Sequence, residues 1–470
     1  MDYNAIEYYF DDIESFYIEL GELLQQSCET DQHVQHVVTQ YIQFLIRFQK
    51  EFITTQAQMA QVAYKLIDST FYLEHSTVIL SHIVQSHALT CHDASGLLIA
   101  YTLLLYAGKE DPRWMQYVVS EATIRKRNQL LCKIIDELDS FAVDRVMCGL
   151  ALALGFEMGK VAKFRRLDLG KKVVINRRCT EIGNELNSIP LSIFGILDAI
   201  TINKLDFLLD LVESTRLDTE ESFNYDIIRL LLVFNEQFMM AQNRPNLLVE
   251  ALVNRLGSTT TFGENMIFML NRSDDSCVQL LILKLLYCIF TEPKLYEYFY
   301  TNDLYVLVDV ILREVCDLGD DREAETLRDA YLRILRPLLV NTQLRHKPYK
   351  KTEIHQILCS LITPYMHRNV ESSSKKLAQR ILEDWWENIC QQKVAPVLGV
   401  DIKNAIIHSG TGLQHSAIIK PSTSPIPQSP CSTSSSSFKS DLSPSSINHT
   451  SSSTSPLSLS LPNSPPPQKC

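Results

Sequence analysis

The sequence predicts an all-α fold that is followed by a disordered tail, and three observations support this prediction. Apolar residues recur at helical spacing through residues 1–395, for example in "DDIESFYIELGELLQQ" (11–26) and "VQHVVTQYIQFLIRF" (34–48). The signals of strands and hairpins are almost absent from this body. Composition changes near residue 396, and residues 421–470 hold ten of the chain's 18 prolines. Such a Ser/Pro-rich segment buries too little apolar surface to fold, so residues 396–470 are predicted to be a disordered tail.

Prolines and small polar residues mark the expected helix boundaries of the body. Pro112 is expected at the start of a helix, where its missing N–H costs nothing. Asp226, Pro245 and Asp274 are expected at or near the starts of three further helices. Pro337 is expected to kink or split the helix that contains it.

The stretch "EYFYTNDLYVLVDVILRE" (297–314) indicates how these helices are arranged. Asn302 and Asp303 are expected to cap a helix over about residues 303–317. This helix has little polar surface, and the preceding helix at 275–290 is equally apolar. Helices of this kind must be covered on several sides by other helices. We therefore predict an armadillo- or HEAT-like α-solenoid over residues 1–395, although the apparent helix starts do not follow a regular 40-residue repeat.

Composition narrows the class of protein. The chain has 470 residues, 46% of them hydrophobic, and a net charge of −11, so a large core is possible and general nucleic-acid binding is not expected. Twelve single cysteines predict reduced thiols in the cytoplasm. The acidic N-terminal segment does not resemble a signal peptide, and no apolar run is long enough to span a bilayer. Any membrane association is expected to be peripheral.

Signatures of catalysis and of metal binding are missing from the sequence. Cys28, His33 and His36 form a loose cluster that is better explained as a polar helix face, because no second ligand pair follows at metal-site spacing. Ser372-x-x-Lys375 matches a nucleophile pattern, but helix capping explains it better. We expect no enzyme activity and no cofactor.

Two basic segments stand out on this acidic chain. Residues 160–178 hold eight Lys or Arg side chains against one Asp, and a smaller basic cluster includes Lys350 and Lys351. Such segments suit an acidic partner or anionic lipid, and a solvated loop explains residues 160–178 equally well. On charge alone, the candidate partner-binding residues are Arg165, Arg166, Lys171, Lys172, Lys350 and Lys351.

The tail contains two PxxP segments, Pro427 to Pro430 and Pro462 to Pro465. PxxP segments favour the extended helix that SH3 domains bind, although chance matches are common in Ser/Pro-rich sequences. The four prolines Pro427, Pro430, Pro462 and Pro465 are therefore the candidate SH3 ligands.

Five segments between residues 223 and 355 closely resemble the leucine-rich domain of the WISH/DIP family of actin regulators. They are "YDIIRLLLVFNEQFM", "TFGENMIFMLNR", "LLILKLLYCIFT", "EYFYTNDLYVLVDVILRE" and "LRDAYLRILRPLLVNTQL" with the following "YKKTEI". Animal members carry an N-terminal SH3 domain, whereas this chain starts directly with helices, so it resembles the fungal form.

The resemblance implies an armadillo-like body that binds the Arp2/3 complex and activates it without a pre-existing filament. The linear filaments so formed would seed branched networks at endocytic cortical actin patches, and the tail would bind SH3-domain proteins. Within the resembling region, Glu264, Asn271 and Arg272 border a helix and are candidate contacts, although helix capping or a tie between repeats explains them better. The alternative function is a non-catalytic armadillo-type scaffold that only gathers SH3-domain proteins through its tail.

Overall fold

The computed structural model describes residues 12–124, 127–167, 194–219, 221–241, 244–363 and 371–390. All of these residues belong to one compact unit, Met1–Ala395. The predictions for the tail and for residues 168–178 concern residues outside these ranges.

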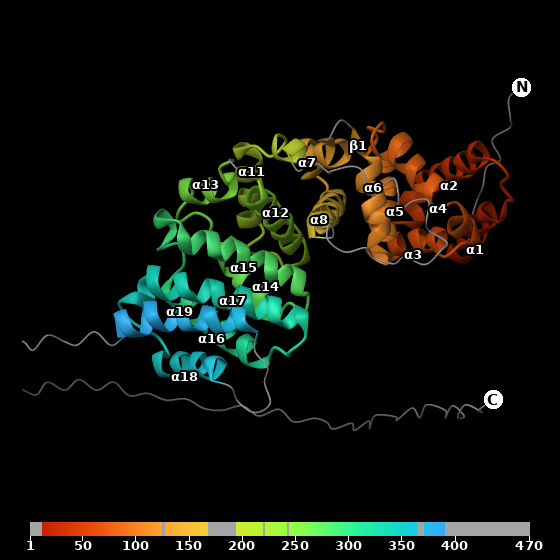
Figure 1. Ribbon diagram of the computed structural model, residues 1–470. Coiled ribbons are helices and arrows are strands. Elements are labelled where there is room, and N and C mark those ends of the chain that lie inside the picture. Colours follow the sequence, from red (N-terminus) through yellow and green to blue (C-terminus); the bar gives the residue numbers. More distant parts are fainter. Residues whose placement is uncertain are drawn as a thin grey trace, which may run out of the picture. The chain divides into compact units, whose positions relative to one another are not determined.

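The first part of the unit consists of paired helices (Figure 1). It contains a 3₁₀ turn at Leu23–Gln25, a π-helical segment at Ile83–Ala88 and one short antiparallel ladder, in which β1 (Thr123–Ile124) pairs with β2 (Arg127–Asn128). Its helices are α1 (Ile13–Glu22), α2 (Asp31–Phe52), α3 (Gln56–Ile67), α4 (Thr70–His82), α5 (Ala94–Glu110), α6 (Pro112–Glu121), α7 (Gln129–Phe141) and α8 (Arg145–Leu167).

The second part continues the same pattern, with 3₁₀ turns at Pro293–Leu295 and Gln343–Arg345 and a π-helical segment at Leu382–Cys390. Its helices are α10 (Phe194–Leu197), α11 (Ile202–Ser214), α12 (Ser222–Met240), α13 (Leu247–Asn254), α14 (Thr260–Arg272), α15 (Ser276–Thr291), α16 (Thr301–Asp317), α17 (Arg322–Asn341), α18 (Lys351–Ile362) and α19 (Ser372–Ile381).

Six helices pack one on the next in chain order and form what we call the central row: α5, α8, α12, α15, α17 and α19. The other helices flank this row; for example, α11, α13 and α14 pack on α12, and α16 packs on α17. Helices α5 and α12 are buried almost all round, with every residue from Ile227 to Phe238 of α12 buried except Arg229. This stacking confirms the predicted armadillo- or HEAT-like α-solenoid.

Several expected boundaries are correct and others are wrong. Pro112 is the first residue of α6, capped by Asp111, and the helix predicted at 275–290 is α15. Pro245 precedes α13, whose cap is Asn246. Asp226, in contrast, lies inside α12 and not at its start, because that helix begins one turn earlier at Ser222.

The helix predicted at 303–317 is α16, but its start differs from the expectation. Helix α16 begins at Thr301, so Asn302 and Asp303 lie in its first turn, and Tyr300 takes the cap position without a side-chain hydrogen bond. Ser372 is likewise the first residue of α19, and Glu371 precedes it. Pro337 lies within α17, which continues to Asn341 without being split. The capping rules placed the starts of α12, α16 and α19 up to one turn too late, because tertiary packing can override local helix propensity.

Candidate partner-binding surface

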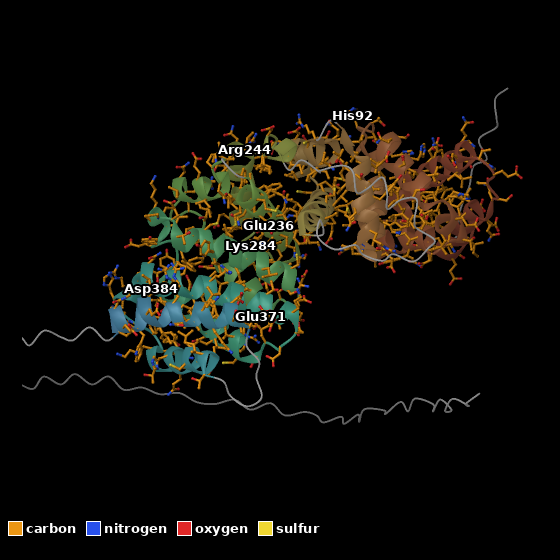
Figure 2. All side chains as sticks on the ribbon, in the orientation of Figure 1. His92, Glu236, Arg244, Lys284, Glu371 and Asp384 are labelled. Atoms are coloured by element: carbon orange, nitrogen blue, oxygen red, sulfur yellow. The ribbon has the colours of Figure 1, made fainter. Side chains whose placement is uncertain are left out.

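From α12 onward, polar side chains tie each helix of the central row to the next one. Lys284 of α15 pairs with Glu236 of α12 (Figure 2), and Ser276 of α15 donates a hydrogen bond to Glu323 of α17. Asn341 at the end of α17 donates to the carbonyl of Phe290, at 2.9 Å. Because hydrogen bonds require defined geometry, these ties fix how far one helix can slide along the next.

The same arrangement continues between α17 and the last helices. Ser374 of α19 donates to Asp329 at 2.5 Å, and Arg336 pairs with Asp384 in the π-helical segment. In sequence, the ties from α12 onward join residues that are 45 to 51 positions apart. This spacing is the structural repeat that the apparent helix starts in the sequence did not reveal.

The flanking helices are tied in a similar way. The Glu213 carboxylate of α11 accepts hydrogen bonds from the backbone amides of Thr261 and Phe262, at 3.2 and 3.0 Å, so it caps helix α14 from a different repeat. The Thr259 hydroxyl and carbonyl both lie within hydrogen-bonding distance of the Tyr298 hydroxyl, at 3.0 and 2.9 Å. Burial raises the pKa of Tyr298, so this phenol stays neutral and able to donate.

The candidates in α14 fall into two groups. Asn271 is a structural tie, since its side-chain oxygen accepts a hydrogen bond from Arg313 of α16 at 2.9 Å. The Arg272 guanidinium lies 3.8 Å from the centre of the Phe268 ring and is exposed, as is Glu264. Arg272 and Glu264 are therefore available to a partner, whereas Asn271 is engaged within the protein.

The neighbouring candidates Lys350 and Lys351 differ in the contacts that they make within the protein. Lys350 is the residue before α18 and adopts the left-handed conformation, with φ of 45°. Its ammonium lies 3.0 Å from Asp309 and 3.6 Å from Glu353. The hydrogen bond to Asp309 raises the pKa of Lys350. Lys350 thus ties α18 to α16, and both Lys350 and Lys351 are exposed.

The remaining candidates cannot be placed in the site. Arg165 and Arg166 lie in the last turn of α8, and the structure describes no side chain there. Lys171 and Lys172 lie outside the described residues, as do Pro427, Pro430, Pro462 and Pro465.

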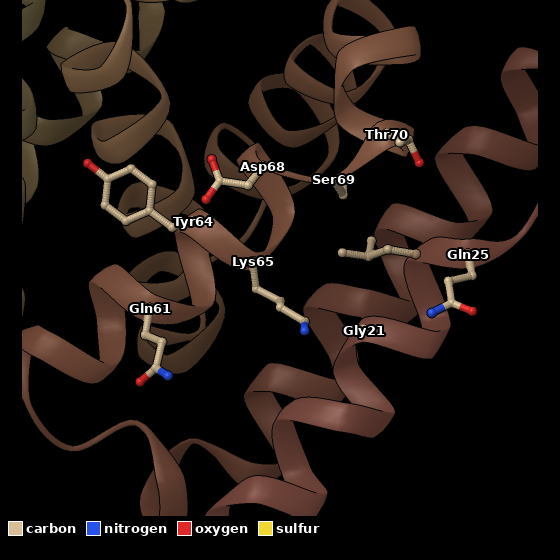
Figure 3. Close-up of a pocket in the computed structure, with 9 residues that line it drawn as sticks. Gly21, Gln25, Gln61, Tyr64, Lys65, Asp68, Ser69 and Thr70 are labelled. Carbon is tan, nitrogen blue, oxygen red and sulfur yellow. The ribbon is translucent and has the colours of Figure 1, made fainter. Parts of the chain in front are cut away.

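A pocket of about 620 Å³ opens between α1 and α3 (Figure 3). The Lys65 side chain extends from α3 over Gly21 of α1, where an added Cβ would lie 2.9 Å from the Lys65 Cε atom. Gln25, Gln61 and Asp68 add polar groups to a lining that also includes Leu24 and Tyr64. Among the described residues there is no group of three or more His, Cys, Asp or Glu side chains that could hold a metal ion. In the same part of the chain, no helix is both long and apolar enough to cross a bilayer.

Sequence reasoning missed two exposed residues of the central row. Tyr287 of α15 is 43% exposed, and Arg333 of α17 is exposed as well. In the sequence both residues lie within strongly apolar stretches. The buried apolar residues of each helix recur every three or four positions, and this spacing would have placed Tyr287 and Arg333 on the face opposite to the buried one.

Comparisons with known proteins show which proteins this chain resembles in sequence. Residues 220–354 match the family model described as SPIN90/Ldb17, leucine-rich domain. Protein dip1 of Schizosaccharomyces pombe is 38% identical over 176 residues, which is 35% of this chain and 46% of dip1. Protein LDB17 of Saccharomyces cerevisiae is 38% identical over 165 residues, 33% of each chain. LDB17 of Eremothecium gossypii is 30% identical over 220 residues, 42% of this chain and 48% of that protein.

The matches span less than half the length of each of these three curated relatives. They confirm the resemblance found at residues 223–355. The helices concerned are α12 to α17 and the first residues of α18, and they include the ties Lys284–Glu236, Ser276–Glu323 and Asn341–Phe290.

Proposed function

We propose that this chain, which carries the SPIN90/Ldb17 leucine-rich domain at residues 220–354 and is related there to the WISH/DIP family, is an actin regulator that binds and activates the Arp2/3 complex. The family match to the α12–α17 stack carries the proposal. Activation would need no pre-existing filament, and the linear filaments formed would seed branched networks at endocytic cortical actin patches.

The ties in this stack support such a role mechanically. A binding protein shifts a conformational equilibrium only as far as it prefers one state of its target over the other. To move an equilibrium from 1:99 to 99:1, that preference must reach about 5.5 kcal/mol. A binding surface that could deform to fit both states would lose the preference. The pairs Glu236–Lys284, Ser276–Glu323 and Asn341–Phe290 hold three neighbouring helices in register and oppose such deformation.

The role we propose is non-catalytic and cytoplasmic. The sequence motifs of enzymes are missing, and binding alone suffices for a population shift. The PxxP segments, Pro427 to Pro430 and Pro462 to Pro465, would recruit SH3-domain proteins to the site of filament assembly. A flexible segment would allow this second contact without changing the geometry of the first.

A pyrene-actin assay tests the proposal. Purified full-length chain is mixed with actin monomers and the Arp2/3 complex, without other nucleation-promoting factors and without filament seeds. The proposal predicts faster polymerisation and single-molecule images of unbranched filaments with the complex at one end. Polymerisation at the rate of actin with the complex alone would reject activation and leave the scaffold function, which a pull-down on SH3 domains tests separately.

A further inference from the structure

Helices α15 and α17 each keep one stripe of half-buried or exposed residues, and these two stripes include cations and one aromatic side chain. The ties Ser276–Glu323 and Asn341–Phe290 join the two helices near both ends, so α15 and α17 run in the same direction. Counting along both helices from these ties places Lys284 near the level of Arg333 and Tyr287 near the level of Arg336. We call these four residues, with the half-buried Leu280 and Ala330 beside them, the central-row face.

The carboxylates around this face are already engaged within the protein. Glu236 pairs with Lys284 and its side chain is only 4% exposed, and Asp329 accepts a hydrogen bond from Ser374. Asp384 pairs with Arg336 and lies 4.0 Å from Arg380. Among the residues that the structure describes, in contrast, no carboxylate forms an ion pair with Arg333. Arg333 is therefore the one cation of this face that no carboxylate of the described residues balances, on a chain whose net charge is −11.

The face also has an aromatic anchor. Tyr287 is 43% exposed, and its hydroxyl has no hydrogen-bond partner among the described residues. Tyrosine and arginine are enriched among the residues that dominate binding energy at protein interfaces. Each of them can bury a large side chain while keeping one polar group for a hydrogen bond or an ion pair.

We propose that the central-row face is the docking surface for an acidic protein segment that also carries apolar side chains. A carboxylate of this segment would meet Arg333, which has no ion pair among the described residues, and its apolar side chains would cover Tyr287 and Leu280. The inference rests on the proposed function, since it takes this segment to belong to the actin-related complex. Charge complementarity selects this occupant, because the chain's own tail has a small net positive charge, with four Lys and two Asp in residues 396–470.

The test compares two charge reversals in the full-length chain. Arg333→Glu should weaken binding to the purified Arp2/3 complex by about tenfold or more, because it places like charges opposite each other at the centre of the contact. Arg216→Glu, at another exposed arginine, in the α11–α12 connection, is the matched control and should bind like the wild type. Tyr287→Ala should also weaken binding, and wild-type affinity should fall as salt is raised.

Thermal unfolding of each variant separates folding from binding. Since Arg333 is exposed, Arg333→Glu should keep the melting temperature of the wild type. If the wild type binds and activates the complex but Arg333→Glu does so equally well, this inference fails and the proposed function stands. Equal loss in Arg216→Glu would also overturn it, since that would indicate a general charge effect. If the wild type itself does not bind, the proposed function fails. A dimer of the chain that Arg333→Glu dissociates would assign the face to a second copy and reject the acidic partner.

Discussion

Lys284 of α15 is ion-paired with Glu236 of α12, and this pair connects two neighbouring helices of the central row. The two partners are not equally buried, since the side chain of Glu236 is 4% exposed and that of Lys284 is 33% exposed. The carboxylate has therefore lost most of its contact with water and depends on the lysine, whereas the lysine remains partly solvated.

Removing the lysine should cost more stability than removing both charges. Lys284→Met leaves a buried carboxylate without its cation and should lower the free energy of unfolding by about 2–4 kcal/mol. The double variant Glu236→Gln/Lys284→Met should recover much of this loss, because no buried charge remains. Urea unfolding of both variants measures the difference. A double variant that is no more stable than Lys284→Met would contradict this account.

Two glycines of α8 predict opposite effects of the same substitution. A Cβ at Gly159 would overlap a methyl carbon of Val233 in α12, whereas a Cβ at Gly149 would meet Phe223 at an ordinary 3.7 Å. Gly159→Ala should destabilise the protein by about 1–3 kcal/mol through overpacking. Gly149→Ala should stabilise it by up to about 1 kcal/mol, since alanine favours helix. Thermal unfolding that shows the same shift for both variants would refute the close α8–α12 contact.

The cap that Glu213 places on α14 should be measurable. Glu213→Ala leaves the amides of Thr261 and Phe262 without their acceptor and should cost about 1–2 kcal/mol. Glu264→Ala in α14 itself is the control, because Glu264 is exposed, and it should change stability by less than about 0.5 kcal/mol. Hydrogen exchange of the α14 amides distinguishes the two variants. Unchanged protection in Glu213→Ala would show that the cap contributes nothing.

Stability should decline in mild acid because of His87. Burial, with a smaller effect of the nearby His82, lowers the pKa of His87 to about 4 from an ordinary value of 6.5. The unfolded chain therefore binds more protons than the folded chain between pH 6.5 and 4. The contribution of neutral His87 is present in full above pH 6.5 and is lost as pH falls toward 4. His87→Gln should flatten this part of the pH–stability curve, and an unchanged slope would assign it to other groups.

The sequence was sufficient for the fold class because each helix carries its own apolar pattern. Helices α15 and α16 follow directly from the spacing of residues such as Leu281, Leu285, Leu307 and Ile311, all of which are buried. The position of Pro112 is equally local, since it depends on one missing N–H.

The repeat and the surface could not be predicted in this way, because they depend on contacts between distant residues. Glu213 caps a helix that begins almost 50 residues later, and nothing near Thr261 indicates it. Lys350 was a reasonable candidate from charge alone, but Asp309, which engages it, lies 41 positions earlier. Arg333 was not distinguished from the other arginines of α17 until the neighbouring helices were in place.

The most direct test of the central claim is the effect of the purified full-length chain on actin polymerisation with the Arp2/3 complex, free of seeds and of other activators. Our account predicts that the lag before polymerisation shortens with increasing chain, and that the effect disappears when the complex is omitted. If the complex binds the chain but the lag stays the same at every concentration of the chain, the account is contradicted.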